Sequence, residues 1–247
     1  MQFRAYPILV ALIGNAVACA AVADDPTAES ATSQEKTPDA IREFTETYGR
    51  GTLDVGHWSL TTNDLRTRII EPSGGDPGGY LYGEVASPIP TWSTASSRVL
   101  QGSDGSAPGD TIFVGNYYAN RIHRISADMC VYQAGSWSAS RTVTLQLTRW
   151  GAANATVALE ATYSLPDIPE VPEGWQHFQF EVDARSATIP PGWVLSRGDG
   201  TPGTDADWAV LMHQVDVVSF GYWKLGHVYP ALGLWKLGID NIHIGTW

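Results

Sequence analysis

The sequence predicts an all-β chain folded as a two-sheet antiparallel β-sandwich of jelly-roll type. Short runs rich in valine, isoleucine, threonine and aromatic residues recur along the 247 residues, and several alternate apolar with polar positions. Turn-forming segments separate them, for example residues 72–79 and 101–110, which are rich in glycine, proline and aspartate. Helical periodicity is almost absent, and many short strands with long loops are typical of sandwiches.

The strands expected from these runs follow one another along the chain. In the run 141–150, Val143, Leu145 and Leu147 share one face, while the residues between them, threonine and glutamine, share the other. A first strand is expected at 43–48, although Thr37 and Pro38 also fit the start of a helix. The remaining expected strands are 56–62, 79–85, 111–117, 121–132, 141–150, 156–164, 175–183, 215–223 and 237–245.

The tetrapeptide Trp-Lys-Leu-Gly occurs twice, starting at Trp223 and at Trp235. Glycines and Pro230 lie between the copies, so we expect the chain to turn back there and to place 220–223 and 237–244 on neighbouring or near-neighbouring core strands. Strict alternation in the second segment puts Ile239 and Asn241 on one face and Asp240 with Ile242 and Ile244 on the other. The two copies are a local similarity, because the sequence contains no repeat of a longer period.

The amino terminus has the pattern of a secretory signal peptide at 1–23. Arg4 precedes an apolar stretch, and Ala21-Val22-Ala23 is followed by two aspartates, as at a cleavage site. Residues 24–40 are polar and predict a disordered linker, and 41–247 form the predicted β-sandwich domain. We expect a secreted protein, extracellular or periplasmic, without a membrane span; lipoprotein anchoring at Cys19 is the alternative. If cleavage follows Ala23, Cys130 is the one cysteine left in the mature chain, and it is expected to be a buried, inert thiol.

Charge restricts the partners. The formal net charge is −11, which argues against nucleic acid and anionic membranes as ligands. Acidic polysaccharide would be repelled overall, unless a local basic patch or a divalent cation intervened.

Four stretches carry a resemblance to a family. Residues 73–81, 113–129, 207–223 and 235–244, in this order and spacing, resemble laminin-B-like secreted bacterial proteins, which are jelly-roll sandwiches of unassigned function. The last of them is also similar to the final strand of carbohydrate-binding jelly rolls and galactose-binding-like domains. The resemblance implies the fold strongly and the function weakly.

The same resemblance implies a structural calcium site. In jelly-roll binding modules an aspartate of the last strand often binds calcium, which requires several oxygen ligands. Asp240 is the candidate here, with Glu46 and Asp54 as candidate partners. The alternative is that Asp240 accepts a hydrogen bond from a neighbouring loop.

Aromatic side chains near turns are the candidate ligand contacts. Trp137, Tyr117 and Tyr118 lie in or beside predicted turns, where indole and phenol rings can present a flat face to a sugar. Most of the ten tryptophans are expected in the core.

A catalytic alternative depends on three other residues. His123, Lys224 and Tyr229 lie in segments with a faint similarity to motifs of alginate lyases, which use a Tyr/His pair as acid and base on a uronate. Arg121 stands where those motifs have glutamine. The sequence therefore favours a secreted non-catalytic sandwich that binds extracellular carbohydrate or matrix, with a polysaccharide lyase and a structural surface protein as alternatives.

Overall fold

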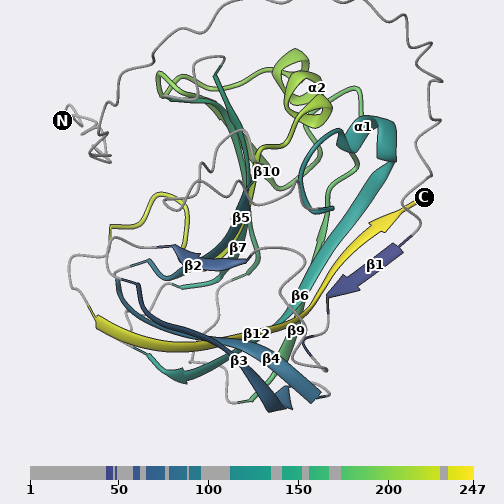
Figure 1. Cartoon of the computed structure of the whole chain (residues 1–247). Coiled ribbons are helices and arrows are strands. Elements are labelled where there is room, and N and C mark those ends of the chain that lie inside the picture. The colour runs from purple at the N-terminus through teal and green to yellow at the C-terminus, as the bar shows by residue number, and fades with distance from the viewer. Residues whose placement is uncertain are drawn as a thin grey trace, which may run out of the picture. The chain divides into compact units, whose positions relative to one another are not determined.

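The computed structural model describes one compact unit of the chain, within Pro38–Trp247 (Figure 1). The described residues are 43–46, 48, 58–61, 65–75, 78–87, 89–95, 112–134, 141–151, 156–166, 174–228 and 233–247. The predicted signal peptide and linker, 1–23 and 24–40, lie outside them. Within these ranges, no helix has the length and apolar character needed to cross a membrane.

The unit is built from two antiparallel sheets of six strands each, which confirms the predicted fold class. The first sheet has the order β3 (Leu65–Gly75), β4 (Gly78–Ser87), β12 (Gly233–Thr246), β6 (Ile122–Gln133) and β9 (Gln176–Glu181), and β1 (Glu43–Glu46) pairs with the last residues of β12. The second has the order β10 (Trp193–Arg197), β8 (Val157–Ser164), β7 (Val143–Trp150), β11 (Val217–Tyr222), β5 (Thr91–Ala95) and β2 (Ser59–Thr61).

The core lies between the two sheets and is rich in aromatic rings. Phe180 of β9 lies 6.0 Å from Phe220 of β11 and 5.8 Å from Tyr163 of β8, measured between ring centroids. Five of the nine tryptophans that the structure describes are buried: Trp58, Trp92, Trp193, Trp208 and Trp235. Each sheet thus presents alternate residues to the core and leaves the intervening residues on its outer face.

The prediction that the two Trp-Lys-Leu-Gly copies lie on neighbouring strands is wrong. Tyr222, next to the first copy, ends β11 in the second sheet, whereas Trp235 belongs to β12 in the first sheet. The two rings stack across the core with centroids 6.2 Å apart and planes 10° from parallel. Both sheets need large apolar residues on their inner faces, so similar sequences arise opposite each other rather than side by side.

The alternation predicted for the last strand also fails at one residue. Asn241 has φ 45°, and the pairing of β12 with β6 shifts register between Asp240 and His243. This bulge resets the alternation, so Ile239, Ile242 and Ile244 are all buried in the core. The strand is an interior one, between β4 and β6, as its apolar content predicted.

Two short helices lie where the sequence predicted strand or loop (Figure 1). Residues 112–116 form turns with a single bridge from Gly115 to Val215, and α1 (Tyr117–Asn120) follows, where a strand was expected. α2 (Asp205–His213) replaces an expected loop; Thr204 and Asp207 form a capping box at its start. Strands β3, β5 and β10 were not expected.

Candidate functional site

The outer face of the first sheet carries a group of aromatic side chains. In β4, Leu81 and Val85 point into the core, so Tyr80, Tyr82 and Glu84 lie on the opposite, outer face. The register aligns Tyr82 with Gly238 of β12, and Gly238 with Cys130 of β6. Residues of three distant segments therefore share one surface.

Four rings pack together on this face. Tyr80 is the centre: its ring centroid lies 5.1 Å from that of Trp175, 5.9 Å from that of Tyr132 and 6.5 Å from that of Tyr82. Tyr82 and Tyr132 are also 5.9 Å apart. Tyr132 is 47% exposed, whereas Tyr80 is buried beneath its neighbours. We call Tyr80, Tyr82, Tyr132 and Trp175 the aromatic cluster.

A glycine in the middle of the sheet makes room for the cluster. A Cβ atom at Gly238 would lie 2.8 Å from Cη2 of Trp175 and 3.0 Å from Cδ2 of Tyr80, so the rings lie directly over the bare backbone of β12. The indole Nε1 of Trp175 donates a hydrogen bond of 2.7 Å to the carbonyl of Gly74, at the end of β3. This bond connects Trp175, which directly precedes the edge strand β9, to β3 at the opposite edge of the sheet.

Polar groups border the cluster toward the Glu84 side. The hydroxyl of Tyr82 donates to Oε1 of Glu84 at 2.7 Å, and Nζ of Lys236 lies 3.1 Å from the same oxygen. Burial and then the nearby Glu84 carboxylate raise the pKa of Tyr82, while burial and a hydrogen bond with Tyr80 raise the pKa of Tyr132. Both phenols therefore stay protonated at physiological pH and can donate as well as accept hydrogen bonds.

A second set of polar side chains lies beside the bulge within β12. Nδ1 of His177 donates to Oδ1 of Asp128 at 2.6 Å, and Nδ2 of Asn241 donates to Oδ2 of Asp128 at 2.6 Å. The backbone N–H of Asn241 donates to Oδ1 of Asp240 at 2.8 Å. The side chain of His177 is 55% exposed, so its imidazole is the solvent-facing member of this network.

The arrangement suits binding of a polar molecule with flat apolar faces. Aromatic rings supply a surface for stacking, and carboxylate, ammonium, imidazole and phenol groups around them supply hydrogen-bond partners. The sequence did not single out these residues as a site. The alternation of Tyr80, Tyr82 and Glu84 was a usable local signal, but Trp175 and Tyr132 join them only through long-range register.

The aromatic residues predicted as ligand contacts do not belong to this cluster. Tyr117 is buried, and its hydroxyl donates to the carbonyl of Phe113 at 2.6 Å, so its ring has a core role and no open face. Tyr118 is 41% exposed and packs against the ring of His213 and the guanidinium of Arg185. Trp137 lies outside the described residues.

The residues of the lyase alternative are not brought together as far as the structure describes them. His123 is near the start of β6, where its ring packs on that of Trp247 with centroids 4.5 Å apart. Lys224 comes two residues after the end of β11 at Tyr222. The ring of Tyr222 stacks on that of Trp235, and Trp235 lies near the last residues of β6, at the end opposite to His123. About ten residues of strand, roughly 30 Å, separate these two positions. Tyr229 lies outside the described residues.

The calcium candidates are described only in part. Asp240 is fully buried on the outer face, covered by the β3–β4 hairpin at Gly75. The backbone of Glu46 pairs with Ile242, but the side chain of Glu46 and the whole of Asp54 lie outside the described part. Among described residues, no group of three or more histidine, cysteine, aspartate and glutamate side chains is placed to hold a metal ion. A calcium site stays a prediction.

Cys130 lies beneath the aromatic cluster as a free, buried thiol. Burial raises the pKa of this thiol, so it stays protonated and is a poor nucleophile.

Comparison with known proteins adds similar folds and no family. No family model and no curated protein matches the chain. A family 11 carbohydrate-binding module of the cellulase Lic26A-Cel5E of Clostridium thermocellum is similar in structure, with a TM-score of 0.45 and 13% identity over 84% of this chain and 96% of the module. The CBM22-1–GH10 part of xylanase 10B from the same organism has a TM-score of 0.43 and 10% identity, over 82% of this chain and 28% of that one. Likenesses this weak carry no inference about ligands, which has to come from the residues of this chain.

Proposed function

We propose that this chain is a secreted, non-catalytic β-sandwich that binds extracellular carbohydrate, or glycan of an extracellular matrix, through the aromatic cluster. The observation that carries the proposal is the gathering of Tyr80, Tyr82, Tyr132 and Trp175 on one outer sheet face, bordered by ionisable side chains.

The chemistry of a sugar matches this surface. A pyranose ring offers a flat face of C–H groups to an aromatic ring, and its hydroxyls donate and accept hydrogen bonds around the rim. Tyr132 supplies an exposed ring, while Glu84 and Lys236 at one border and His177 at the other supply partners for hydroxyls.

The charges favour a neutral glycan at this face. Glu84 and Asp128 both lie on it and would repel the carboxylates of a polyuronate, whereas carboxylates are good acceptors for sugar hydroxyls. The net charge of −11 acts in the same direction.

Three finer statements belong to the same proposal. Secretion is supported by the signal-like pattern at 1–23, and membership of the laminin-B-like proteins by the four stretches that resemble them. A structural calcium ion at Asp240 is supported by its position in the last strand. The calcium proposal is tested by the melting temperature in calcium and in chelator, independently of the glycan.

An enzymatic alternative is favoured by one observation. His177 is oriented by a carboxylate, Asp128, on an exposed face beside aromatic rings, and an oriented imidazole is suited to act as a general base. Incubating the protein with neutral and acidic polysaccharides and measuring released reducing ends separates the two functions. Cleavage that is lost in His177→Ala would establish the enzyme and remove the non-catalytic proposal.

Affinity electrophoresis through gels containing neutral soluble polysaccharides, such as mixed-linkage β-glucan and xylan, tests the binding itself. At least one is expected to retard the full chain, and Tyr132→Ala is expected to weaken this by about tenfold, the loss of one to two stacking contacts. Tyr118→Ala is the matched control, because Tyr118 is exposed to a similar degree at a distant place. Equal losses in both variants, or no retardation by any polysaccharide, would contradict the proposal.

A further inference from the structure

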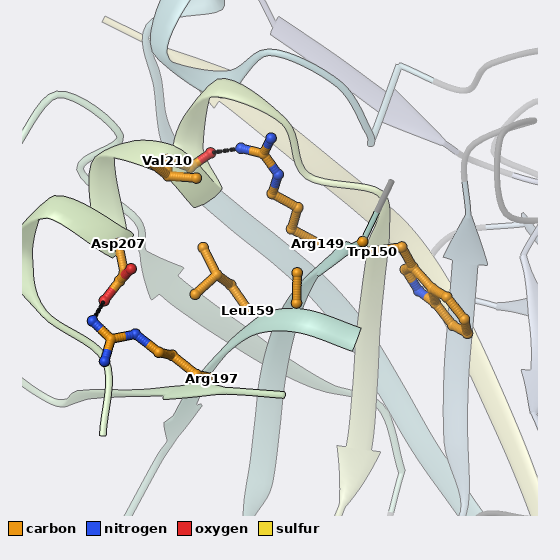
Figure 2. Close-up of a pocket in the computed structure, with 8 residues that line it drawn as sticks. Arg149, Trp150, Leu159, Arg197, Asp207 and Val210 are labelled. Carbon is orange, nitrogen blue, oxygen red and sulfur yellow. Dashed lines mark hydrogen bonds and ion pairs between the residues drawn. The ribbon is translucent and has the colours of Figure 1, made fainter. Parts of the chain in front are cut away.

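A cavity of about 430 Å³ opens at one end of the second sheet, between α2 and the strands β7, β8 and β10 (Figure 2). Arg149 of β7 and Arg197 of β10 point toward α2 from the sheet, with Leu159 between them and Val210 on the helix above. The aromatic cluster lies on the outer face of the other sheet, so this is a separate site.

The charge of Arg197 is already balanced. Its Nη2 lies 2.7 Å from Oδ2 of Asp207, which also accepts hydrogen bonds of 2.8 Å from the hydroxyl and the backbone N–H of Thr204. The hydrogen bonds from Thr204 and the pair with Arg197 hold the pKa of Asp207 below its usual range. Asp199 is a second carboxylate that interacts with Arg197. Arg197 therefore supports the start of α2 more than it attracts an anion.

Arg149 is in a different position. Its Nη1 donates at 2.5 Å to the carbonyl of Val210, in the last turns of α2, where helix carbonyls lack intrahelical partners. In the described part of the chain, no carboxylate pairs with Arg149. This bond uses one of the five N–H donors of the guanidinium, so four donors remain for a ligand.

The surroundings strengthen an anion contact at Arg149. Leu159 is buried and Val210 is apolar, so the guanidinium lies beside hydrocarbon, where electrostatic attraction is stronger than in water. The planar fork of arginine matches a carboxylate in a bidentate geometry. The pocket is large enough for a small ligand, since such sites span about 300–1,000 Å³.

We propose that this pocket binds an acidic sugar, a uronate unit whose carboxylate pairs with Arg149 and whose ring packs on Leu159 and Val210. A carboxylate is favoured over phosphate because Asp207 lines the same pocket and repels a dianion more than a monoanion. This supplies the local basic site that an overall acidic protein needs in order to accept an acidic glycan. The chain then has two sites of different preference, neutral sugar at the aromatic cluster and acidic sugar here.

Isothermal titration of the full chain with trigalacturonate, with galactotriose and with inorganic phosphate tests this. Trigalacturonate is expected to bind at least about tenfold more tightly than the other two, and Arg149→Gln to remove this preference. Arg185→Gln is the matched control: it removes the same charge and one hydrogen bond to a carbonyl, that of Tyr118, outside the pocket. Arg149→Lys keeps the positive charge but loses the planar fork of the guanidinium. Its preference for trigalacturonate is expected to lie between that of the unaltered protein and that of Arg149→Gln.

The melting temperature shows whether Arg149→Gln remains folded. Val210→Asp is a second variant that should weaken trigalacturonate binding, because it adds a charge that repels the carboxylate at an exposed residue of the pocket. Tyr132→Ala is expected to leave trigalacturonate binding unchanged, so failure of this inference and failure of the glycan face are distinguishable. Trigalacturonate binding that is no tighter than galactotriose or phosphate, or that survives both Arg149→Gln and Val210→Asp, would overturn the inference.

Discussion

Replacing Gly238 by alanine is expected to damage the aromatic cluster without unfolding the sandwich. The new Cβ would meet Cη2 of Trp175 at 2.8 Å and Cδ2 of Tyr80 at 3.0 Å, whereas ordinary contacts begin at 3.4 Å. The ring of Trp175 must therefore move by about 0.6 Å, the difference between 2.8 Å and 3.4 Å, and the ring of Tyr80 by about 0.4 Å, the difference between 3.0 Å and 3.4 Å. Trp175 is held by its bond to Gly74, so its movement also strains that hydrogen bond.

The expected cost falls mainly on binding. Trp175 is the partly exposed ring of the two, and Tyr80 lies buried beneath it. Displacing Trp175 removes one stacking contact of about 0.5–1.5 kcal/mol, which is roughly 2- to 12-fold in the dissociation constant. The free energy of unfolding should change by only about 0–2 kcal/mol, because the gain from replacing glycine in a strand offsets part of the crowding.

Affinity electrophoresis on the best neutral polysaccharide, together with urea unfolding, measures the two effects. Gly151→Ala is the control, since a Cβ there would lie 3.5 Å from the carbonyl oxygen of Thr156, in ordinary contact. Unchanged retardation of Gly238→Ala in a folded protein would refute the idea that the ring positions matter for binding.

Four further outcomes are expected. Ile242→Ala should lower the free energy of unfolding by about 2–5 kcal/mol in urea titration, because the side chain is fully buried in the core; a neutral result would mean that the strand is misplaced. Asn241→Ala should cost about 1–2 kcal/mol more than Asn241→Gly, since both lose the bond to Asp128 but only alanine is strained at φ 45°; equal costs would argue against the bulge. Burial raises the pKa of Glu160. The free energy of unfolding therefore falls as the pH rises above the usual pKa of a glutamate, because the charged carboxylate is less favourable in the folded than in the unfolded protein. Glu160→Gln should thus raise the melting temperature at neutral pH and lose this advantage near pH values of about 4, where the unfolded carboxyl is protonated; no gain at neutral pH would contradict it. Calcium, if it binds at Asp240, should raise the melting temperature relative to chelator, and identical melting curves would remove the calcium proposal.

The fold class could be predicted because it depends on local alternation. Val143, Leu145 and Leu147 alternate with polar residues over a full strand, and this pattern has the same meaning whichever strand pairs with it. The helix at 205–213 was missed because its start, Thr204 to Asp207, carries aspartate where the usual capping box has glutamate or glutamine.

The candidate site could not be predicted, because it depends on pairings between distant segments. Tyr80, Tyr132 and Trp175 belong to β4, to β6 and to the residue before β9, and nothing within any one of these segments specifies its neighbours. Tyr117 shows the converse: beside a predicted turn it resembled a surface residue, yet the first turn of α1 points its ring into the core.

The bulge at Asn241 links the core to the candidate site. With strict alternation, Asp240 would face the same side as Ile242 and Ile244, and a carboxylate would enter the apolar core, at a cost of several kcal/mol. The left-handed backbone at Asn241 advances the chain by one position without reversing the face, so the isoleucines stay inside and Asp240 remains outside. Asparagine is suited to this place, because it tolerates a positive φ and its amide can then reach the carboxylate of Asp128. The same residue thus keeps charge out of the core and holds Asp128, which in turn orients His177 at the border of the aromatic cluster.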